Sequence, residues 1–214
     1  MPRYDDNISI SVIRRLPRYL RFLEALKNNG VIKISSKELA ARMGLTASQI
    51  RQDLNCFGEF GQQGYGYNVP TLYDELKKIL GLNHAFKTIM IGAGNLGRAV
   101  AMHLYFEGKG FDLIGIFDKN KELEGEKLNG IEIMLDDKIE QFCKEHSPEA
   151  AVLCVPNEAA EMLCSKLVSY GIKGFWNFSH YDITVAHPDA VVENVHLGDG
   201  LMTLCYKLSE QQNS

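Results

Sequence analysis

The sequence predicts an α/β protein of two domains, a small helical domain followed by a larger one built on a parallel sheet. The chain has 214 residues, which is long for one average domain and sufficient for two cores. In its first 80 residues, apolar side chains recur at helical spacing. From Phe86 onward, short apolar runs alternate with longer helical stretches, which is the pattern of βαβ units. We expect a first domain at 1–82, a second at 83–196 and a terminal helix at 197–214.

The composition excludes several classes of protein. With 45% hydrophobic and 23% charged residues, the chain is typical of globular rather than disordered proteins. No apolar run approaches the roughly 18 to 20 residues that cross a bilayer, and residues 1–10 lack the apolar core of a signal peptide. A cytoplasmic location without a membrane partner is therefore expected. The five cysteines are scattered without paired or metal-ligand spacing, which predicts small buried thiols, no disulfide and no metal.

The net charge of −4 conceals a difference between the two parts of the chain. Residues 1–80 hold 12 Lys or Arg and 8 Asp or Glu, a charge of +4, whereas residues 81–214 hold 11 and 19, a charge of −8. Clustered cationic side chains attract phosphates and release their counterions. The first domain is therefore the candidate for binding nucleic acid.

The first domain begins with a predicted amphipathic helix. Apolar residues recur at helical spacing from Val12 to Leu26, and arginines occupy much of the remaining surface. Pro17 predicts a break or a short leading segment, because its ring removes a backbone donor. The basic side carries Arg14, Arg15, Arg18 and Arg21.

Two helix start signals follow. Ser35 and Glu38 form the capping-box pattern, in which a hydroxyl and a carboxylate satisfy unpaired amides, and Thr46 and Gln49 repeat this pattern. Gly44 lies where the chain must reverse. The spacing predicts a helix-turn-helix whose second helix reads DNA.

Residues 57–69 alternate large aromatics with glycines around a Gly-Gln-Gln-Gly tip, which predicts a hairpin and hence a winged helix. A further helix over 71–80 and a linker over 83–85 would complete the domain. A solvated polar face is the alternative interpretation of the second helix, since helix-turn-helix units also occur in proteins that bind no DNA. The candidate DNA-contacting residues are Arg15, Ser48, Gln49, Arg51, Gln52, Gln62, Gln63, Gly64 and Tyr65, of which Arg51 is the strongest.

In the second domain, a glycine-rich turn joins a predicted strand at 88–91 to a predicted helix at 98–106. Its first glycine allows the bend, its second lets the backbone approach a pyrophosphate, and its third allows close packing. The turn reads Gly92-Ala93-Gly94-Asn95-Leu96-Gly97. The sequence therefore predicts a Rossmann-like, doubly wound sheet that binds a dinucleotide. We expect further strands at 112–117, 131–134, 151–155, 174–177 and 191–195.

Asp118 ends the second strand, where a carboxylate can accept hydrogen bonds from both adenosine ribose hydroxyls and would repel a 2′-phosphate. NAD(H) is therefore favoured over NADP(H), although Lys119 weakens this exclusion, and over CoA, whose 3′-phosphate would lie near the carboxylate. Val155 and Pro156, at the end of the fourth strand, either close over the cofactor or form only a turn. In the alternative without a nucleotide, the glycines merely make a tight turn and Asp118 caps a helix.

The order of these motifs resembles the Rex family over nearly the whole chain. The resemblance implies a homodimeric repressor that binds a palindromic operator through paired winged helices and leaves it when NADH accumulates relative to NAD⁺. It also implies that the terminal helix, with its stripe of Leu201, Leu204 and Leu208, is swapped onto the partner. The matching residues are Arg15-Leu16-Pro17-x-Tyr19-x-Arg21, Gln49-Ile50-Arg51-x-Asp53-Leu54, Phe57 to Gly61, Gly66 to Val69, Gly92 to Gly97, Gly171 to Gly174 and Asn177-Phe178.

Several positions depart from the pattern of that family. Three glutamines stand where the family usually carries basic residues, which predicts fewer phosphate contacts and a weaker salt dependence. They are Gln52, Gln62 and Gln63. His103 stands where the family usually has a tyrosine near the nicotinamide, and His196 where it has an aspartate that acts in the switch with the arginine matching Arg21. We expect a divergent paralogue whose redox response is blunted, retuned or linked to pH.

Two other functions stay open from the sequence alone. An NAD-dependent oxidoreductase needs a side chain that manages a proton beside the nicotinamide, and no carboxylate is paired in sequence with His103, His180, His187 or His196 to orient one. We therefore expect no catalysis. The other possibility is a DNA-binding dimer that keeps its nucleotide only as a structural part.

Overall fold

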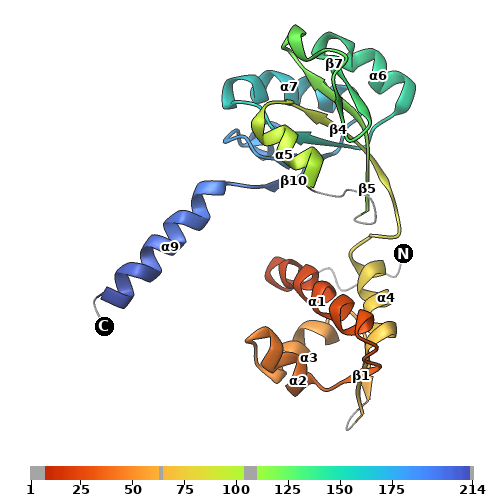
Figure 1. The fold of residues 1–214 in the computed structure, drawn as a ribbon, viewed down its shortest axis with the longest axis vertical. Helices are drawn as coiled ribbons and strands as arrows, with labels where there is room; N and C mark the ends of the chain where they lie inside the picture. The colour runs from red at the N-terminus through yellow and green to blue at the C-terminus, as the bar shows by residue number, and fades with distance from the viewer. Residues whose placement is uncertain (1–7, 63–64, 104–109, 213–214) are drawn as a thin grey trace. The chain divides into compact units, whose positions relative to one another are not determined.

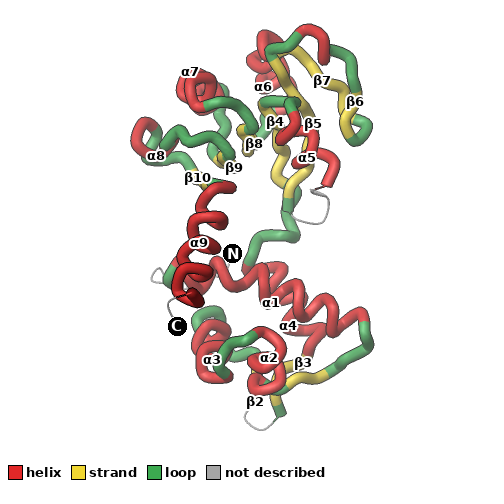
Figure 2. Tube along the Cα trace, turned by 60° about the vertical axis from the view of Figure 1, so that its left-hand side comes forward, coloured by secondary structure: helices red, strands yellow, loops and turns green. Residues whose placement is uncertain are grey.

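A computed structural model describes residues 8–62, 65–103 and 110–212. The chain divides into two compact units, Met1–Asn83 and His84–Ser214. We refer to them as unit 1 and unit 2. Figure 1 colours the chain from red in the first helix to blue in the last, and Figure 2 distinguishes helices, strands and loops.

Unit 1 is a winged helix, as predicted. Its helices enclose one apolar core in which Leu23, Leu39 and Ile50 are fully buried. Its elements are α1 (Ile10–Asn28), β1 (Lys33–Ile34), α2 (Ser36–Met43), α3 (Ala47–Asn55), β2 (Gly61–Gln62), β3 (Gly66–Asn68) and α4 (Val69–Ile79).

The wing is a three-stranded antiparallel sheet in the order β1-β3-β2. The sequence predicts the β2–β3 hairpin but misses β1, whose two residues are too few to show an alternating pattern. Gly66 has a φ of +71°, and a Cβ there would lie 2.5 Å from the carbonyl oxygen of Ile34. This glycine therefore lets β1 and β3 approach each other. Gln63 and Gly64, at the expected tip, lie outside the described residues.

Helix α1 runs through Pro17 without interruption, so the predicted break is wrong. Pro17 is exposed, and it removes only the backbone hydrogen bond that the carbonyl of Ile13 would accept. On the other side of the helix, Leu16, Tyr19 and Leu23 are buried in the core. Packing of this face keeps the helix continuous across the proline.

The helix-turn-helix forms with one complete capping box and one half-formed box. The Ser35 hydroxyl accepts from the backbone amide of Glu38 at 3.1 Å, and the Glu38 carboxylate accepts from the backbone amide of Ser35 at 2.9 Å. At α3, the Thr46 hydroxyl accepts from the amide of Gln49 at 3.1 Å. The Gln49 side chain donates elsewhere, so the predicted second box lacks its return bond.

Unit 2 is a doubly wound domain around a seven-stranded sheet in the order β10-β9-β8-β4-β5-β7-β6. From β4 the chain moves outward to β5 and β7, and then returns to place β8 on the other side of β4. The carboxyl ends of β4 and β8 therefore form the switch point where such sheets bind ligands. The elements are β4 (Phe86–Ile91), α5 (Asn95–His103), β5 (Phe111–Asp118), β6 (Lys127–Leu128), β7 (Ile131–Leu135), α6 (Ile139–His146), β8 (Ala150–Leu153), α7 (Asn157–Ser169), β9 (Gly174–Asn177), α8 (Ile183–Ala186), β10 (Val191–Asn194) and α9 (Leu197–Gln212), with 3-10 turns at Lys121–Leu123 and Asp136–Lys138.

Helices cover both faces of this sheet. Ile89 and Ile91 of β4 lie in a core cluster with residues of α6 and α7, whereas Met90 lies in a second cluster with residues of α5. A central parallel strand is buried on both faces, and therefore reads as a continuous apolar run.

The sheet prediction misses β6, which pairs antiparallel with β7. Leu128 lies opposite Ile131 across a two-residue turn, and both turn residues have positive φ, +54° at Asn129 and +83° at Gly130. An Asn-Gly pair between apolar residues is a strong hairpin signal. This strand could therefore have been predicted.

Helix α9 runs from Leu197 to Gln212 and contains the predicted stripe of leucines, and every one of its residues is exposed. Among the described residues, no helix is both long and apolar enough to span a membrane. An amphipathic helix with this much exposed apolar surface indicates a missing partner. Its large exposed apolar residues are Leu197, Leu201, Met202, Leu204, Tyr206 and Leu208.

Replacing Pro17 with alanine should raise the free energy of unfolding of unit 1 by roughly 1 to 3 kcal/mol, since interior proline costs a helix about 3 kcal/mol and its stiffening of the unfolded chain offsets part of this. Denaturant unfolding followed by circular dichroism measures the change. Pro70→Ala is the matched control, because Pro70 lies in the first turn of α4, where no backbone donor is needed. Equal effects of the two substitutions would contradict this account.

Candidate functional site

The glycine-rich turn lies at the switch point of the unit 2 sheet. Gly92 has a φ of +97°, and a Cβ there would lie 2.4 Å from the carbonyl oxygen of Cys154. A Cβ on Gly97 would lie 1.9 Å from the carbonyl oxygen of Gly92, whereas one on Gly94 would meet no atom within 4 Å. The fold itself therefore requires Gly92 and Gly97. The open space at Gly94 is where a phosphate could approach the backbone.

Asp118 is the last residue of β5, and its carboxylate forms a hydrogen bond to the glycine-rich turn. Its Oδ2 accepts from the amide of Ala93 at 2.7 Å, and its Oδ1 accepts from the amide of Asn120 at 2.8 Å. The carboxylate is half-buried, and each oxygen keeps a further lone pair that a ribose hydroxyl could use. Lys119, the next residue, is exposed.

A second bond to the turn comes from Arg98, which the sequence analysis did not single out. Its Nε donates to the carbonyl of Ala93 at 3.1 Å, and its Nη2 donates to Glu126 at 2.5 Å. The helix that carries it begins at the exposed Asn95, followed by the half-buried Leu96. Arg98 follows the last glycine of the motif directly, and that position is the only sequence signal for its role.

Val155 and Pro156 follow β8, which ends at Leu153 rather than at the predicted residue 155. The Val155 side chain lies beside the glycine-rich turn, since a Cβ on Gly92 would lie 3.1 Å from its Cγ1. The exposed Pro156 is the N-cap residue of α7.

Burial raises the pKa of the Cys154 thiol to about 12, so this thiol stays protonated at neutral pH and is a weak nucleophile. The expectation of buried thiols fails for two of the other four cysteines. Cys143 and Cys164 are buried, and Cys56 and Cys205 are exposed.

His196 lies directly before α9 and stacks on His180, with 5.2 Å between ring centroids and 5° between ring planes. Its Nδ1 is buried without a hydrogen-bond partner among the described residues. Arg21 is exposed on α1 of unit 1. His103 ends α5, and its side chain lies outside the part of the chain that is described. No group of three or more His, Cys, Asp or Glu within that part could hold a metal ion.

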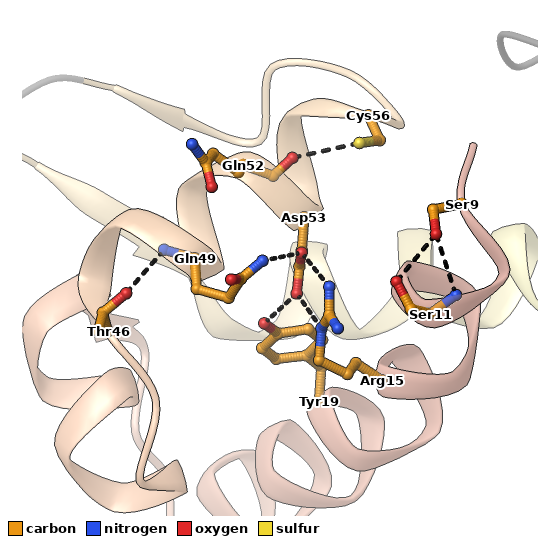
Figure 3. Close-up of polar contacts among 9 residues, drawn as sticks. All are labelled: Ser9, Ser11, Arg15, Tyr19, Thr46, Gln49, Gln52, Asp53 and Cys56. Carbon is orange, nitrogen blue, oxygen red and sulfur yellow. Dashed lines mark hydrogen bonds and ion pairs between the residues drawn. The ribbon is translucent and has the colours of Figure 1, made fainter. Parts of the chain in front are cut away.

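In unit 1, the buried carboxylate of Asp53 joins α3 to α1 (Figure 3). Arg15 donates to it twice at 2.7 Å, from Nε to Oδ2 and from Nη2 to Oδ1. The hydroxyl of Tyr19 donates to Oδ2 at 2.7 Å, and the amide Nε2 of Gln49 donates to Oδ1 at 2.8 Å. Asp53 is 1% exposed, and these bonds use all four of its lone-pair positions.

The partners of Asp53 keep it ionised. Burial alone would raise the pKa of this carboxyl, but the hydrogen bonds from Arg15, Tyr19 and Gln49, with the charge of Arg15, lower the pKa below its ordinary value of 3.8. Burial and the bond to Asp53 raise the pKa of Tyr19, which stays a neutral donor. Two candidate DNA contacts, Arg15 and Gln49, are therefore bonded inside unit 1. The bond from Arg15 spans 38 positions and no local pattern indicates it, whereas Gln49 and Asp53 are spaced i, i+4 on one helix, where such pairs meet.

The other candidates on α3 are exposed. Ser48 and Gln52 lie on the surface of the helix. The Nη1 of Arg51 donates to the hydroxyl of Ser36 in the first turn of α2, at 3.0 Å. The side chain of Gln62, like residues 63–64, lies outside the description.

Lys33 is a further basic residue, and it lies on β1, an edge strand of the wing. It is exposed, and its Nζ lies 5.4 Å from the ring centroid of Tyr65, within cation–π distance. Tyr65 is itself 70% exposed. Because residues 57–69 contain no Lys or Arg, Lys33 supplies a positive charge that the hairpin lacks. Sequence reasoning missed it because the pairing of β1 with β3 was not predicted.

Asp53→Asn should destabilise unit 1 by roughly 2 to 5 kcal/mol, because an amide cannot accept four hydrogen bonds and leaves the charge of Arg15 without its partner. The pH dependence gives a second check. A carboxyl whose pKa is lowered by folding contributes stability that is complete above its ordinary pKa of 3.8 and is lost as the pH falls through the lower, folded value. Denaturant unfolding over a pH series should show this loss in the wild type and not in Asp53→Asn.

Asp74→Asn is the control for this series. Asp74 is exposed and pairs with Lys27 across 3.6 Å, so the change should cost no more than about 1 kcal/mol. Wild-type stability of Asp53→Asn at every pH would contradict the role assigned to this carboxylate.

Two family models match the chain. One, described as "Putative DNA-binding protein N-terminus", matches residues 7–55, which include the helix-turn-helix. The other, described as "CoA binding domain", matches residues 83–181, which include the glycine-rich turn.

The chain is also similar over nearly its full length to redox-sensing transcriptional repressors named Rex. It is 54% identical over 205 residues to that of Caldanaerobacter subterraneus subsp. tengcongensis, covering 96% of this chain and 91% of the relative. It is 49% identical over 208 residues to that of Clostridium beijerinckii, covering 97% and 98%.

The chain is also similar over nearly its full length to solved structures of RSP, a Rex-family repressor. RSP in complex with β-NAD⁺ and operator DNA is 51% identical, with a TM-score of 0.89 over 97% of this chain and 95% of that chain. RSP in complex with β-NADH is 48% identical, with a TM-score of 0.87 over 97% of each chain. The chain therefore belongs to the Rex family of redox-sensing transcriptional repressors.

Proposed function

We propose that this protein is a homodimeric repressor that binds palindromic operator DNA through unit 1 and leaves it when NADH binds to unit 2. It would thereby respond to the ratio of NADH to NAD⁺, in the cytoplasm where operator DNA lies. The observation that carries the proposal is one chain with both a winged helix and a dinucleotide turn fastened by Asp118 at the switch point of a sheet. The RSP complexes with operator DNA, NAD⁺ and NADH support it.

NAD(H) is the proposed ligand of unit 2, in preference to CoA. The open space at Gly94, next to the start of α5, suits a pyrophosphate, which a helix N-terminus attracts. Asp118 suits two ribose hydroxyls and would repel the 3′-phosphate of CoA. The proposed contacts are Gly92, Ala93, Gly94, Asn95, Leu96, Gly97, Asp118, Lys119, Val155, Pro156 and His103.

The proposed DNA-binding surface consists of the wing together with the first two turns of α3. The second helix of a helix-turn-helix lies in the major groove with its N-terminal residues at the base edges. Ser48 and Gln52 are exposed on this helix. Arg51 is exposed as well, and it would exchange its single bond to the Ser36 hydroxyl for a contact with DNA. For Arg15 we propose a different role, holding α3 in place through Asp53, because both of its bonds to the carboxylate measure 2.7 Å.

Helix α9 is proposed to pack on a second copy of the chain. In one copy its leucines are between 50% and 66% exposed, which is costly for a soluble helix. A swapped helix would bury this surface and give the two-fold symmetry that a palindromic operator requires.

The link between nucleotide and DNA is proposed to involve Arg21 and His196. His196 is directly followed by α9, and its stacking on His180 leaves Nδ1 without a partner among the described residues. A change in the position or hydrogen bonding of this ring would therefore act at the first residue of α9, the helix proposed to join the two copies. No catalytic activity is proposed for this protein.

NADH should release a labelled operator duplex from the protein and NAD⁺ should release less, because a ligand shifts an equilibrium only by its differential affinity for the two states. Fluorescence anisotropy at fixed total nucleotide and varied NADH/NAD⁺ ratio measures the release. Gly94→Ala is the matched variant: its Cβ meets nothing in the free protein but fills the space beside a pyrophosphate. This variant should fold and bind the operator, and neither nucleotide should change its affinity for the operator.

An unchanged DNA affinity at saturating NADH would overturn the sensing proposal. Nucleotide that co-purifies without exchanging would then indicate a structural role, and steady NADH oxidation with small carbonyl substrates would indicate an oxidoreductase. His196→Asp belongs in the same titration. If His196 blunts the response, the aspartate variant should be released at a lower NADH/NAD⁺ ratio than the wild type.

Lys33→Gln should make the negative slope of log affinity against log salt concentration shallower by about 0.9 for each protomer, because one phosphate contact is lost. Base preference should stay the same, since a phosphate contact carries no sequence information. Operator binding between low and moderate salt measures the slope. Lys144→Gln is the control, because Lys144 is exposed on α6 of unit 2 and pairs with Glu140. Equal slopes for wild type and Lys33→Gln would exclude the contact.

A further inference from the structure

We propose that Arg98 is a positioning residue of the nucleotide site. It holds the peptide group between Ala93 and Gly94 in the orientation that a bound pyrophosphate needs, and Glu126 keeps Arg98 in place. This inference rests on the proposed binding of NAD(H), and it assigns a role to two side chains outside the glycine-rich motif.

Side chains hold both backbone polar groups of Ala93. Its N–H donates to Oδ2 of Asp118 at 2.7 Å, and its carbonyl accepts from Nε of Arg98 at 3.1 Å. Ala93 is 0% exposed, so the loss of either bond would leave a buried polar group without its partner. The turn that joins β4 to α5 is therefore held by the neighbouring strand β5 and by α5 itself.

The bond from Arg98 also determines where the next N–H points. A trans peptide group is planar, so its carbonyl and its N–H point in opposite directions. Because the carbonyl of Ala93 is directed at Arg98, the N–H of Gly94 is directed away from it. Gly94 is exposed, and its N–H has no acceptor among the described residues. This N–H is available to a ligand, at the residue whose open side suits a phosphate.

Reversing this peptide group would reverse the charge that it presents. The carbonyl oxygen of Ala93 would then take the place of the N–H of Gly94, and two negative groups would face each other once a pyrophosphate arrived. The rotation would also break the bond from Arg98. Arg98 therefore favours the productive orientation before the ligand binds, which lowers the cost of ordering the turn.

Glu126 fixes the position of Arg98 and balances its charge. Nη2 of Arg98 donates to Oε2 of Glu126 at 2.5 Å. The backbone of Glu126 is itself held, since its N–H donates to the carbonyl of Leu123 and its carbonyl accepts from the N–H of Ile133. The two bonds of Arg98 leave three of its five N–H groups for other acceptors. Direct contact of Arg98 with the phosphate is therefore the competing account, and the experiment is designed to separate the two.

The experiment compares two ligands that share an adenosine half. ADP-ribose carries the pyrophosphate, whereas adenosine carries only the base and the ribose expected at Asp118. Both are titrated into the full-length protein by calorimetry, and circular dichroism checks that each variant folds. Arg98→Lys keeps the charge but replaces the forked guanidinium with a single ammonium. It should weaken binding of ADP-ribose about 2- to 10-fold, the range for one hydrogen bond, and change binding of adenosine less than about twofold.

Glu126→Ala separates positioning from direct contact by the sign of its effect. Positioning predicts weaker binding of ADP-ribose, because Arg98 loses the carboxylate that holds it in place. Direct contact predicts tighter binding, because a released guanidinium and the loss of a negative charge both favour an anion. Glu124→Ala is the matched control, since it removes the same charge nearby from a carboxylate that pairs with Lys138 at 2.7 Å.

Two results would overturn the inference while the wild type binds ADP-ribose. One is binding of ADP-ribose to Glu126→Ala that is as tight as, or tighter than, binding to Glu124→Ala. The other is an effect of Arg98→Lys that is absent or equal for the two ligands. If Arg98→Lys does not fold, the two glutamate variants still decide. Failure of the wild type to bind ADP-ribose, NADH or NAD⁺ would overturn the proposed nucleotide binding itself, and is distinguished by the lack of any binding.

Discussion

The four hydrogen bonds that converge on Asp53 are the interaction on which the geometry of unit 1 depends. Three of them join a charge on α3 to two side chains of α1, Arg15 and Tyr19, across more than thirty residues of sequence, and the fourth comes from Gln49 of α3 itself. A buried carboxylate is costly unless every lone pair is used, so α3 cannot slide or rotate on α1 without leaving an unpaired charge. Apolar packing around Ile50 holds the helices together, and the carboxylate selects one arrangement among those that packing allows.

Unit 2 uses a carboxylate in a comparable way, but its main constraint is steric. Gly97 and Gly92 approach so closely that no side chain fits, which brings the start of α5 against the end of β4. Asp118 then accepts from the amide of Ala93 and ties this turn to the neighbouring strand. The backbone of the turn is thereby organised before any ligand arrives. A preorganised site loses less conformational entropy on binding.

Features that depend on neighbouring residues could be predicted from the sequence. The capping box at Ser35, the glycine-rich turn and the approximate positions of the parallel strands each rest on signals within a few residues. The continuous α1 could not be predicted, because the packing of Leu16 and Tyr19 overrides the local cost of Pro17. Such an override depends on residues distant in sequence.

The site was predicted with the same limitation. The residues of the nucleotide turn follow from a local motif and lie together. The partnership of Arg15 with Asp53 spans 38 positions, so Arg15 could be identified only as a surface cation. Lys33 was missed for a related reason, since only the pairing of β1 with β3 places it beside Tyr65.

The exposed leucines of α9 bear on how the stability of this protein depends on its concentration. If a second copy covers them, dimerisation stabilises the folded chain, and the midpoint of unfolding rises with protein concentration by mass action. A dilute repressor would then lose operator occupancy by falling apart into single chains, even at a constant nucleotide ratio. The amount of repressor that a cell makes would then affect operator occupancy in addition to the nucleotide ratio. The length and apolar content of α9 would set the strength of dimerisation, and with it the size of this effect.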